Sequence, residues 1–261
     1  MENIDIDKLT PMMKIYCETK EQYKDCILFY RLGDFYAMFF DDALTASREL
    51  EITLTGKSCG LDERAPMCGI PYHAVEGYLN RLVAKGYKVA ICEQVEDPKT
   101  AKGIVKREVV RIVTPGTNLD TQALDETKNN YIMCIVYLAD KYGISLADIS
   151  TGDYFVTEVD SERKLIDEIN KFAPSEIICN ESFYMSGVDL SDMKHRLGIA
   201  VYSLESWYFS DETAENTLKE HFKVQSLEGL GLSDYACGTI AAGALLRYLY
   251  ETQKNDLGNL S

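Results

Sequence analysis

Apolar side chains along the first 117 residues recur alternately at helical spacing and in short runs typical of buried strands. Thr10-Pro11 supplies a helix cap and a first-turn proline, so a helix is expected from there to about Lys24. A Gly33-Asp34 turn divides an apolar stretch over 27–39. The same pattern predicts helices over 41–50 and 74–85, and strands over 52–57, 87–95 and 105–113.

The second part of the chain begins with three predicted strands, over 131–138, 143–149 and 154–159, joined by turns at 140–142 and 151–153. Helices and strands then alternate: helix 161–172, strand 176–179, helix 189–197, strand 199–203, helix 211–222, and a last helix over 234–252 capped by Ser233. Three antiparallel strands followed by this alternation match a ribonuclease H-like topology.

The predicted boundary lies at 114–117, where Pro115 and Gly116 end a strand and a polar stretch follows. We therefore expect an α/β protein of two domains. The first, mixed α/β domain covers residues 1–117, a linker covers 118–128, and the ribonuclease H-like domain covers 129–261.

Composition supports two packed domains, because 46% of the residues are hydrophobic and 26% charged, with only 17 Gly and 6 Pro. No apolar run reaches the roughly 18 residues of a membrane helix, and the acidic N-terminus is unlike a signal peptide. We expect a cytoplasmic protein without membrane contact. The eight cysteines form no C-x-x-C pair and only three histidines exist, so buried reduced thiols are expected and no metal site.

The net charge of −15 is distributed unevenly. Residues 1–117 carry a net charge of −2, whereas residues 118–261 carry −13. Nucleic acid is a polyanion, so any contact with it is expected in the first part.

Three segments of the first part could carry a function. Residues 27–36 hold aromatic side chains on both sides of the Gly33-Asp34 turn, which by themselves favour a strand pair that packs into the core. Residues 66–73 read as a rigid loop with an apolar tip at Met67, and residues 102–111 are the most basic stretch.

Five segments together resemble the N-terminal part of the bacterial MutS family of DNA mismatch-repair ATPases: Thr10-Pro11-Met12-Met13, Phe29-Tyr30-Arg31-Leu32-Gly33-Asp34-Phe35-Tyr36, Gly69-Ile70-Pro71-Tyr72-His73-Ala74-Val75, Val89-Ala90-Ile91-Cys92-Glu93-Gln94 and Arg111-Ile112-Val113-Thr114-Pro115-Gly116-Thr117. The resemblance is close over 117 residues and weaker beyond. It implies a mismatch-binding domain followed by a connector domain on which a MutL-type matchmaker docks.

The resemblance also implies that the lever, clamp and ATPase domains of the family would follow this chain. We therefore expect a fragment that is not itself an enzyme and has no catalytic residues or cofactor, with ATP and Mg²⁺ confined to the missing domains. Full-length members are homodimers around DNA, so the fragment is expected to be monomeric. The polar C-terminal residues 257–261 are consistent with a cut in an interdomain loop.

In the family, the Phe of the Gly-Asp-Phe-Tyr-Glu motif stacks on a mispaired base from the minor groove of double-stranded DNA, which assigns that role to Phe35. We call the Phe35 ring the wedge. Met67 is expected beside it, and Lys57, Lys106 and Arg107 are expected to contact phosphates. The candidate DNA-binding residues are therefore Phe35, Tyr36, Ala37, Lys57, Met67, Lys106 and Arg107.

Ala37 departs from the motif, because the family has a Glu there that hydrogen-bonds the mispaired base. A hydrogen bond to a charged group contributes roughly 1.5–3 kcal/mol. The departure predicts weaker discrimination of mismatches, with DNA binding retained.

Two other functions stay open. The acidic second part could make the chain a protein-interaction module of a MutS-like paralogue. A ribonuclease H-like fold also suggests a Mg²⁺-dependent nuclease. The predicted first strand of that fold, over 131–138, has no acid. Asp148 lies late on the second strand and Asp153 lies in a turn, so the nuclease is disfavoured.

Overall fold

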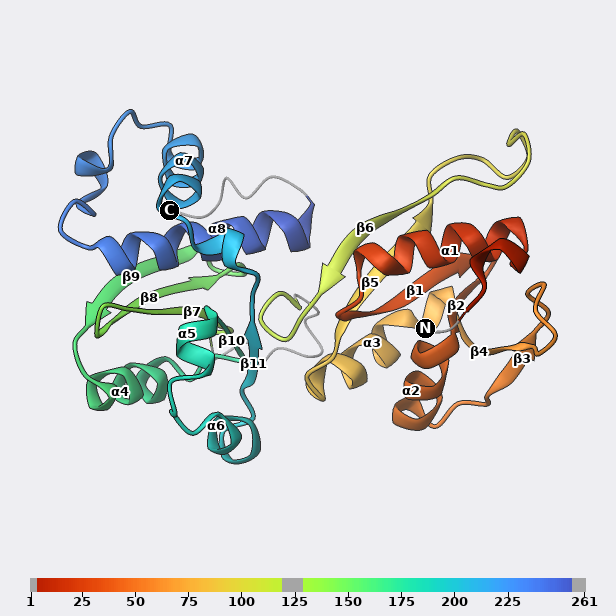
Figure 1. Cartoon of the computed structure of the whole chain (residues 1–261), viewed down its shortest axis with the longest axis horizontal. Coiled ribbons are helices and arrows are strands. Elements are labelled where there is room, and N and C mark those ends of the chain that lie inside the picture. Colours follow the sequence, from red (N-terminus) through yellow and green to blue (C-terminus); the bar gives the residue numbers. More distant parts are fainter. Residues whose placement is uncertain (1–3, 119–128, 255–261) are drawn as a thin grey trace. The chain divides into compact units, whose positions relative to one another are not determined.

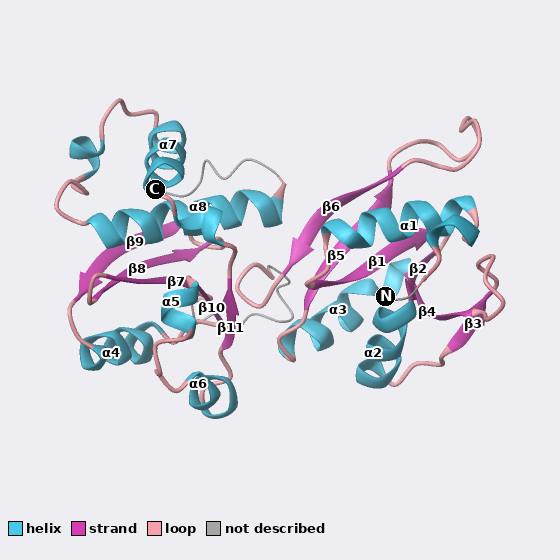
Figure 2. Cartoon of the chain, viewed as in Figure 1, coloured by secondary structure: helices cyan, strands magenta, loops and turns pink. Residues whose placement is uncertain are grey.

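A computed structural model describes residues 4–118 and 129–254 of the chain (Figures 1 and 2). The chain divides into two compact units, Met1–Thr114 (unit 1) and Pro115–Ser261 (unit 2). Apart from Asn118, the predicted linker lies outside the described residues. The predicted fold class, α/β, is confirmed, and the structure has two sheets.

Unit 1 is built on a six-stranded sheet in the order β3-β4-β2-β1-β5-β6. Strands β1 and β5 are parallel, and the other neighbouring pairs are antiparallel. Its strands are β1 (Cys26–Leu32), β2 (Phe35–Phe39), β3 (Thr55–Lys57), β4 (Ala65–Pro71), β5 (Lys88–Gln94) and β6 (Arg107–Val113). Its helices are α1 (Pro11–Gln22), α2 (Phe40–Leu50) and α3 (Val75–Ala84), with 3₁₀ turns η1 (Ile6–Lys8) and η2 (Tyr72–Ala74).

Helices cover both faces of this sheet (Figure 1). On the side that we call the α1 face, the Tyr16 ring packs edge-on against Tyr30 and Phe39, with ring centroids 5.4 and 4.9 Å apart. On the opposite side, the α2/α3 face, Phe29 and Tyr36 share a core with α2 and α3. Successive strand residues point to opposite faces, so each strand contributes to both cores.

The segment 66–73 is not the loop that the sequence suggests. Most of it forms β4, which pairs with β2 on one side and β3 on the other. Pro66 and Pro71 lie at or beside the ends of β4, where a missing N–H interrupts the ladder least. The predicted strand over 52–57 is shorter, starting at Thr55.

Unit 2 has a five-stranded sheet in the order β11-β10-β7-β8-β9. The strands β7, β8 and β9 are antiparallel, and β10 and β11 continue the sheet in parallel with β7. This order is ribonuclease H-like, as predicted. The strands are β7 (Ile132–Leu138), β8 (Lys141–Asp148), β9 (Asp153–Val159), β10 (Glu176–Cys179) and β11 (Ala200–Ser203).

The helices of unit 2 are α4 (Glu162–Phe172), α5 (Glu181–Tyr184), α6 (Leu190–Arg196), α7 (Asp211–Phe222) and α8 (Ala236–Gln253), with 3₁₀ turns η3 (Ser206–Phe209) and η4 (Leu227–Leu230). Figure 1 shows α8 against one face of the sheet and α4, α5 and α6 on the other. Helix α8 lies close to β8: the Ser145 hydroxyl of β8 donates a hydrogen bond to the Ala241 carbonyl of α8 at 2.6 Å.

Two local predictions in unit 2 are wrong, and some short elements were not predicted. The turn between β7 and β8 consists of Ala139 and Asp140, both with positive φ (52° and 61°), so Lys141 already belongs to β8. Ser233 does not cap the last helix: Tyr235 occupies that position without a side-chain cap. The short elements α5, η3 and η4 carry too few periodic residues to be predicted.

All eight cysteines are free and buried, which confirms the expected buried thiols. Burial raises the pKa of Cys26 and Cys179 to about 12, so both stay protonated at neutral pH. Among the described residues, no helix is long and apolar enough to cross a bilayer.

Candidate nucleic-acid interface

The β1–β2 hairpin presents Phe35 at one end of the sheet of unit 1. Leu32 and Phe35 are the last paired residues, so Gly33 and Asp34 alone make the turn, with Gly33 at a φ of 57°. The backbone N–H of Tyr72 donates to the Asp34 carbonyl at 2.9 Å and fixes the turn against β4. Phe35 is 51% exposed, a large value for an aromatic side chain at the start of a central strand.

The exposure of Phe35 follows from where α1 ends its coverage of the sheet. Ala37 and Phe39 point to the same face as Phe35, and both lie in the buried cluster beneath α1. Phe35 is outside that cluster. The ring is therefore available to a ligand that approaches the hairpin end of the sheet.

Gly69 lies beside Phe35, on β4. A Cβ built on Gly69 would stand 3.9 Å from Phe35 Cδ1. Gly69 pairs directly with Ala37, so these two small residues lie on the same face as Phe35, next to its cross-strand partners Leu32 and Pro71. Sequence reasoning did not single out Gly69, because its role depends on the register between β2 and β4.

Tyr36 lies on the opposite face and is 5% exposed. Its hydroxyl donates to Glu93, whose carboxylate also pairs with Arg31 at 3.2 Å. The Arg31 guanidinium lies 4.0 Å from the centroid of the Tyr72 ring, which is 43% exposed. The structure thus places Tyr36 in a support beneath the hairpin and not at the surface predicted for DNA contact. No pattern in the sequence indicated the Arg31–Glu93 pair, because the two residues are brought together only by the pairing of β1 with β5.

Ala37 is fully buried, opposite Tyr30 on β1. The Arg107 guanidinium lies over the Tyr30 ring, 5.0 Å from its centroid. Burial raises the pKa of the Tyr30 hydroxyl, while the positive charge of Arg107 acts in the opposite direction. Ala37 therefore touches protein on all sides, and the structure leaves no polar group at the position of the family's carboxylate.

Lys106, just before β6, and Arg107, its first residue, differ in how firmly their side chains are held. Arg107 Nε donates to the Arg31 carbonyl at 2.7 Å, and Nη1 donates to the Val105 carbonyl at 2.9 Å. Lys106 is exposed, and its ammonium lies 3.2 Å from the Glu108 carboxylate. Lys106 can exchange that surface partner for a phosphate easily, whereas Arg107 must break two hydrogen bonds.

Lys57 and Met67 lie away from the wedge. Met67 is not at a loop tip: it lies within β4 opposite Phe39 and packs partly against the core beneath α1. The register puts it four residues along β4 from the partner of Phe35, or about 13 Å. Lys57, on the edge strand β3, pairs with Ala65 of β4. Ala65 lies six residues, or about 20 Å, along β4 from the partner of Phe35.

The two buried acids among the described residues of unit 2, Asp148 and Glu176, serve the fold. Asp148 accepts hydrogen bonds from the Asn130 and Ser150 backbone N–H groups, at 3.0 and 2.9 Å. Glu176 accepts from the Gly116 N–H at 2.9 Å and from the Tyr248 hydroxyl at 2.6 Å. Within residues 4–118 and 129–254, no group of three or more His, Cys, Asp or Glu could hold a metal ion.

Comparison with known proteins adds two findings. The family model described as MutS domain I matches residues 10–122, and that of MutS domain II matches residues 130–261. Similar relatives include proteins named DNA mismatch repair protein MutS from Lachnoclostridium phytofermentans (68% identical), Clostridium tetani (54%) and Ruminiclostridium cellulolyticum (52%), each over 97% of this chain. The chain spans 27%, 28% and 29% of their respective lengths.

Proposed function

Because the chain belongs to the MutS family of DNA mismatch-repair proteins, we propose that unit 1 binds mismatched double-stranded DNA and inserts Phe35 into the minor groove. The observation that carries the proposal is the exposure of this ring. Phe35 is 51% exposed, whereas Phe29, Tyr30, Tyr36 and Phe39 are all buried. The aromatic segment therefore offers one ring for an external partner.

The physics of a wedge explains how one ring recognises many mispairs. Insertion of an apolar side chain between base steps costs a few kcal/mol of stacking, which contact with the ring restores in part. A mispaired step is already poorly stacked and is easier to kink. The preference thus arises from the deformability of the DNA. Because Ala37 stands where the family has a Glu, the preference for a mispaired step rests on this deformability without a carboxylate hydrogen bond to the base.

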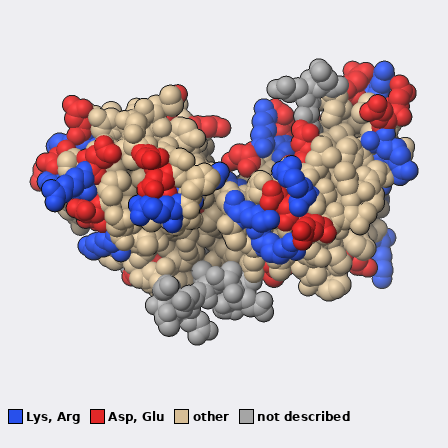
Figure 3. Space-filling model, turned by 90° about the horizontal axis from the view of Figure 1, so that it is seen from below, with Lys and Arg blue, Asp and Glu red and all other residues tan. Residues whose placement is uncertain are grey.

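Positive charge near the hairpin supports phosphate contacts. We assign this role first to Lys106, whose partner is a surface carboxylate, then to Arg107, and, farther from the hairpin, to Lys57. In Figure 3, acidic and basic side chains are intermixed on the visible face of unit 1. Such a surface fits modest, salt-dependent affinity.

For unit 2 we propose docking of a partner protein, of the MutL-matchmaker type that the resemblance implies. The net charge of −13 over residues 118–261 repels DNA and supports this division of tasks. ATP and Mg²⁺ binding, and the homodimer, belong in this proposal to sequence beyond the present chain. The second candidate function, should Phe35 prove not to read mismatches, is that the whole chain acts as a protein-interaction module.

The decisive experiment is Phe35→Ala, assayed by fluorescence anisotropy against a duplex with a one-base bulge and a perfectly paired duplex. We expect the variant to bind both duplexes equally, because the ring supplies the only contact that depends on deformability. Phe155→Ala is the matched control, since Phe155 is similarly exposed (45%) but lies in unit 2. A preference that survives Phe35→Ala would exclude the wedge.

A further inference from the structure

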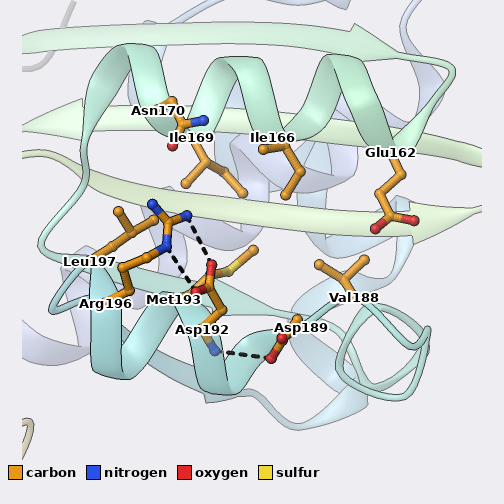
Figure 4. Close-up of a pocket in the computed structure, with 10 residues that line it drawn as sticks. All are labelled: Glu162, Ile166, Ile169, Asn170, Val188, Asp189, Asp192, Met193, Arg196 and Leu197. Carbon is orange, nitrogen blue, oxygen red and sulfur yellow. Dashed lines mark hydrogen bonds and ion pairs between the residues drawn. The ribbon is translucent and has the colours of Figure 1, made fainter.

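Helices α4 and α6 of unit 2 enclose a groove on the side of the sheet opposite α8 (Figure 4). The cavity has a volume of about 90 Å³. Its apolar lining comes from Ile166, Ile169, Val188, Met193 and Leu197. Its polar lining comes from Glu162, Asn170, Asp189, Asp192 and Arg196.

The floor of the groove is preformed. Ile169, Val188 and Met193 are buried, with exposures of 1%, 7% and 3%, and belong to the core beneath α4 and α6. Along α4, Glu162 and Ile166 are four residues apart and so lie on one face of the helix. Figure 4 shows both side chains directed away from α4, with Glu162 on the side of Val188.

The charge of the groove is concentrated at one end. Figure 4 places Glu162 and Asp189 toward the end that carries Val188, and Asn170 and Leu197 toward the other end. The Arg196 guanidinium pairs with both oxygens of Asp192, at 2.8 and 2.9 Å, which neutralises that cation. Glu162 and Asp189, whose Oδ1 accepts from the Asp192 N–H at 3.0 Å, are the two other acids in the lining of the groove.

Apolar side chains near the groove remain uncovered. Leu197, in its lining, is 38% exposed, and Met185, three residues before Val188, is 74% exposed. Figure 3 looks onto this side of unit 2 and shows wide uncharged areas between the charged groups. An exposed apolar area with a charged border is typical of a protein-contact surface.

We propose that this groove docks a basic amphipathic helix of a partner protein. One aliphatic side chain of that helix enters between Ile166 and Met193, and a Lys or Arg one turn away reaches Glu162 and Asp189. The groove volume of about 90 Å³ is smaller than the roughly 150 Å³ that accommodates benzene, which limits the occupant to one short aliphatic side chain. Charge complementarity selects a basic partner, and the two helical walls suit a helix. The inference rests on the part of the proposed function that assigns protein contacts to unit 2.

The test uses the 261-residue chain and a fluorescein-labelled 14-residue helical peptide of leucine and lysine, with a leucine–glutamate peptide as the control ligand. Side-chain methyl NMR signals of Ile166 and Met193 should shift on titration with the lysine peptide only. Glu162→Lys should weaken binding about fivefold or more, because it replaces an attraction at the acidic end by a repulsion. Ile166→Ala should weaken binding by removing the apolar wall.

Asp167→Lys is the matched control, because it changes the charge equally on an exposed α4 position outside the lining. Equal weakening by Glu162→Lys and Asp167→Lys would show unspecific attraction to an acidic unit and overturn the proposal. Shifts confined to residues outside the groove would overturn it as well. Circular dichroism confirms that each variant is folded.

A second arm separates this inference from the proposed function. A MutL-type matchmaker is titrated against the same variants. Matchmaker binding that persists in Glu162→Lys and Ile166→Ala, with no specific binding of the lysine peptide, would reject the groove and keep partner docking on unit 2. Loss of matchmaker binding in both variants, but not in Asp167→Lys, is the result expected if the groove serves that partner.

Discussion

At the scale of single residues, burial separates candidate contacts that are adjacent in the sequence. Phe35 is 51% exposed, Tyr36 is 5% exposed, and Ala37 is fully buried. Side chains alternate between sheet faces, so Tyr36 points into the α2/α3 face, whereas Phe35 and Ala37 point to the α1 face. The contrast between Phe35 and Ala37, which share a face, follows from coverage by α1. The wedge thus depends on a single uncovered position.

Ala37→Glu tests whether the position can read the base. Because position 37 is buried, a carboxylate here must extend past its paired residue Gly69, which has no side chain and adjoins Phe35, to reach the base. We expect the ratio of affinities for bulged and perfect duplex to increase, by up to the roughly 1.5–3 kcal/mol of a charge-assisted hydrogen bond. The measurement is the same anisotropy titration.

The substitution also has a cost in folding, because it places a longer, charged side chain at a buried position. Thermal melting should show a lower Tm than that of the parent chain. Ala37→Gln is the control, since it has a similar size without the charge. An unchanged affinity ratio in a folded Ala37→Glu variant would mean that position 37 does not reach the base.

At the scale of elements, close backbone approach fixes the contact between β8 and α8. A Cβ on Gly143 would stand 2.1 Å from the Cys237 carbonyl oxygen, a distance that forces the helix to move. Gly143→Ala should lower the free energy of unfolding by about 1–3 kcal/mol. Urea denaturation followed by circular dichroism measures this change.

Gly229→Ala is the matched control in the same unit, because a Cβ there meets nothing within 4 Å. Its effect should be within about 0.5 kcal/mol, as for most surface substitutions. Equal stability of the two variants would mean that α8 can shift without loss of packing.

At the scale of the whole molecule, the uneven net charge predicts that unit 1 binds DNA and unit 2 does not. Each unit has its own buried cores, so fragments 1–114 and 115–261 can be compared directly. We expect DNA binding by fragment 1–114, falling as salt increases from 50 to 200 mM, because phosphate contacts release counterions. Fragment 115–261 should bind no DNA in the same titration. Equal DNA affinity of the two fragments would refute the division.

Much of the fold follows from local patterns in the sequence. The helices over 11–22 and 211–222, the strands of both sheets other than β4, and the ribonuclease H-like order were predictable from periodicity and turn residues, and Pro11 marks the first turn of α1, although Thr10 makes no side-chain cap bond. These features depend on neighbours within a few residues, which the sequence displays directly. The family, too, was recognisable from short motifs in a fixed order.

Pairing and coverage between distant segments needed the tertiary structure. Segment 65–71 is a strand because β2 and β3 pair with both of its edges, despite its prolines. Met67 lies far from the wedge, and Gly69 lies beside it, for the same reason of register. Only the packing of α1 leaves Phe35 exposed while it buries Ala37. Local pattern determines which elements form; long-range packing decides which side chains remain for a partner.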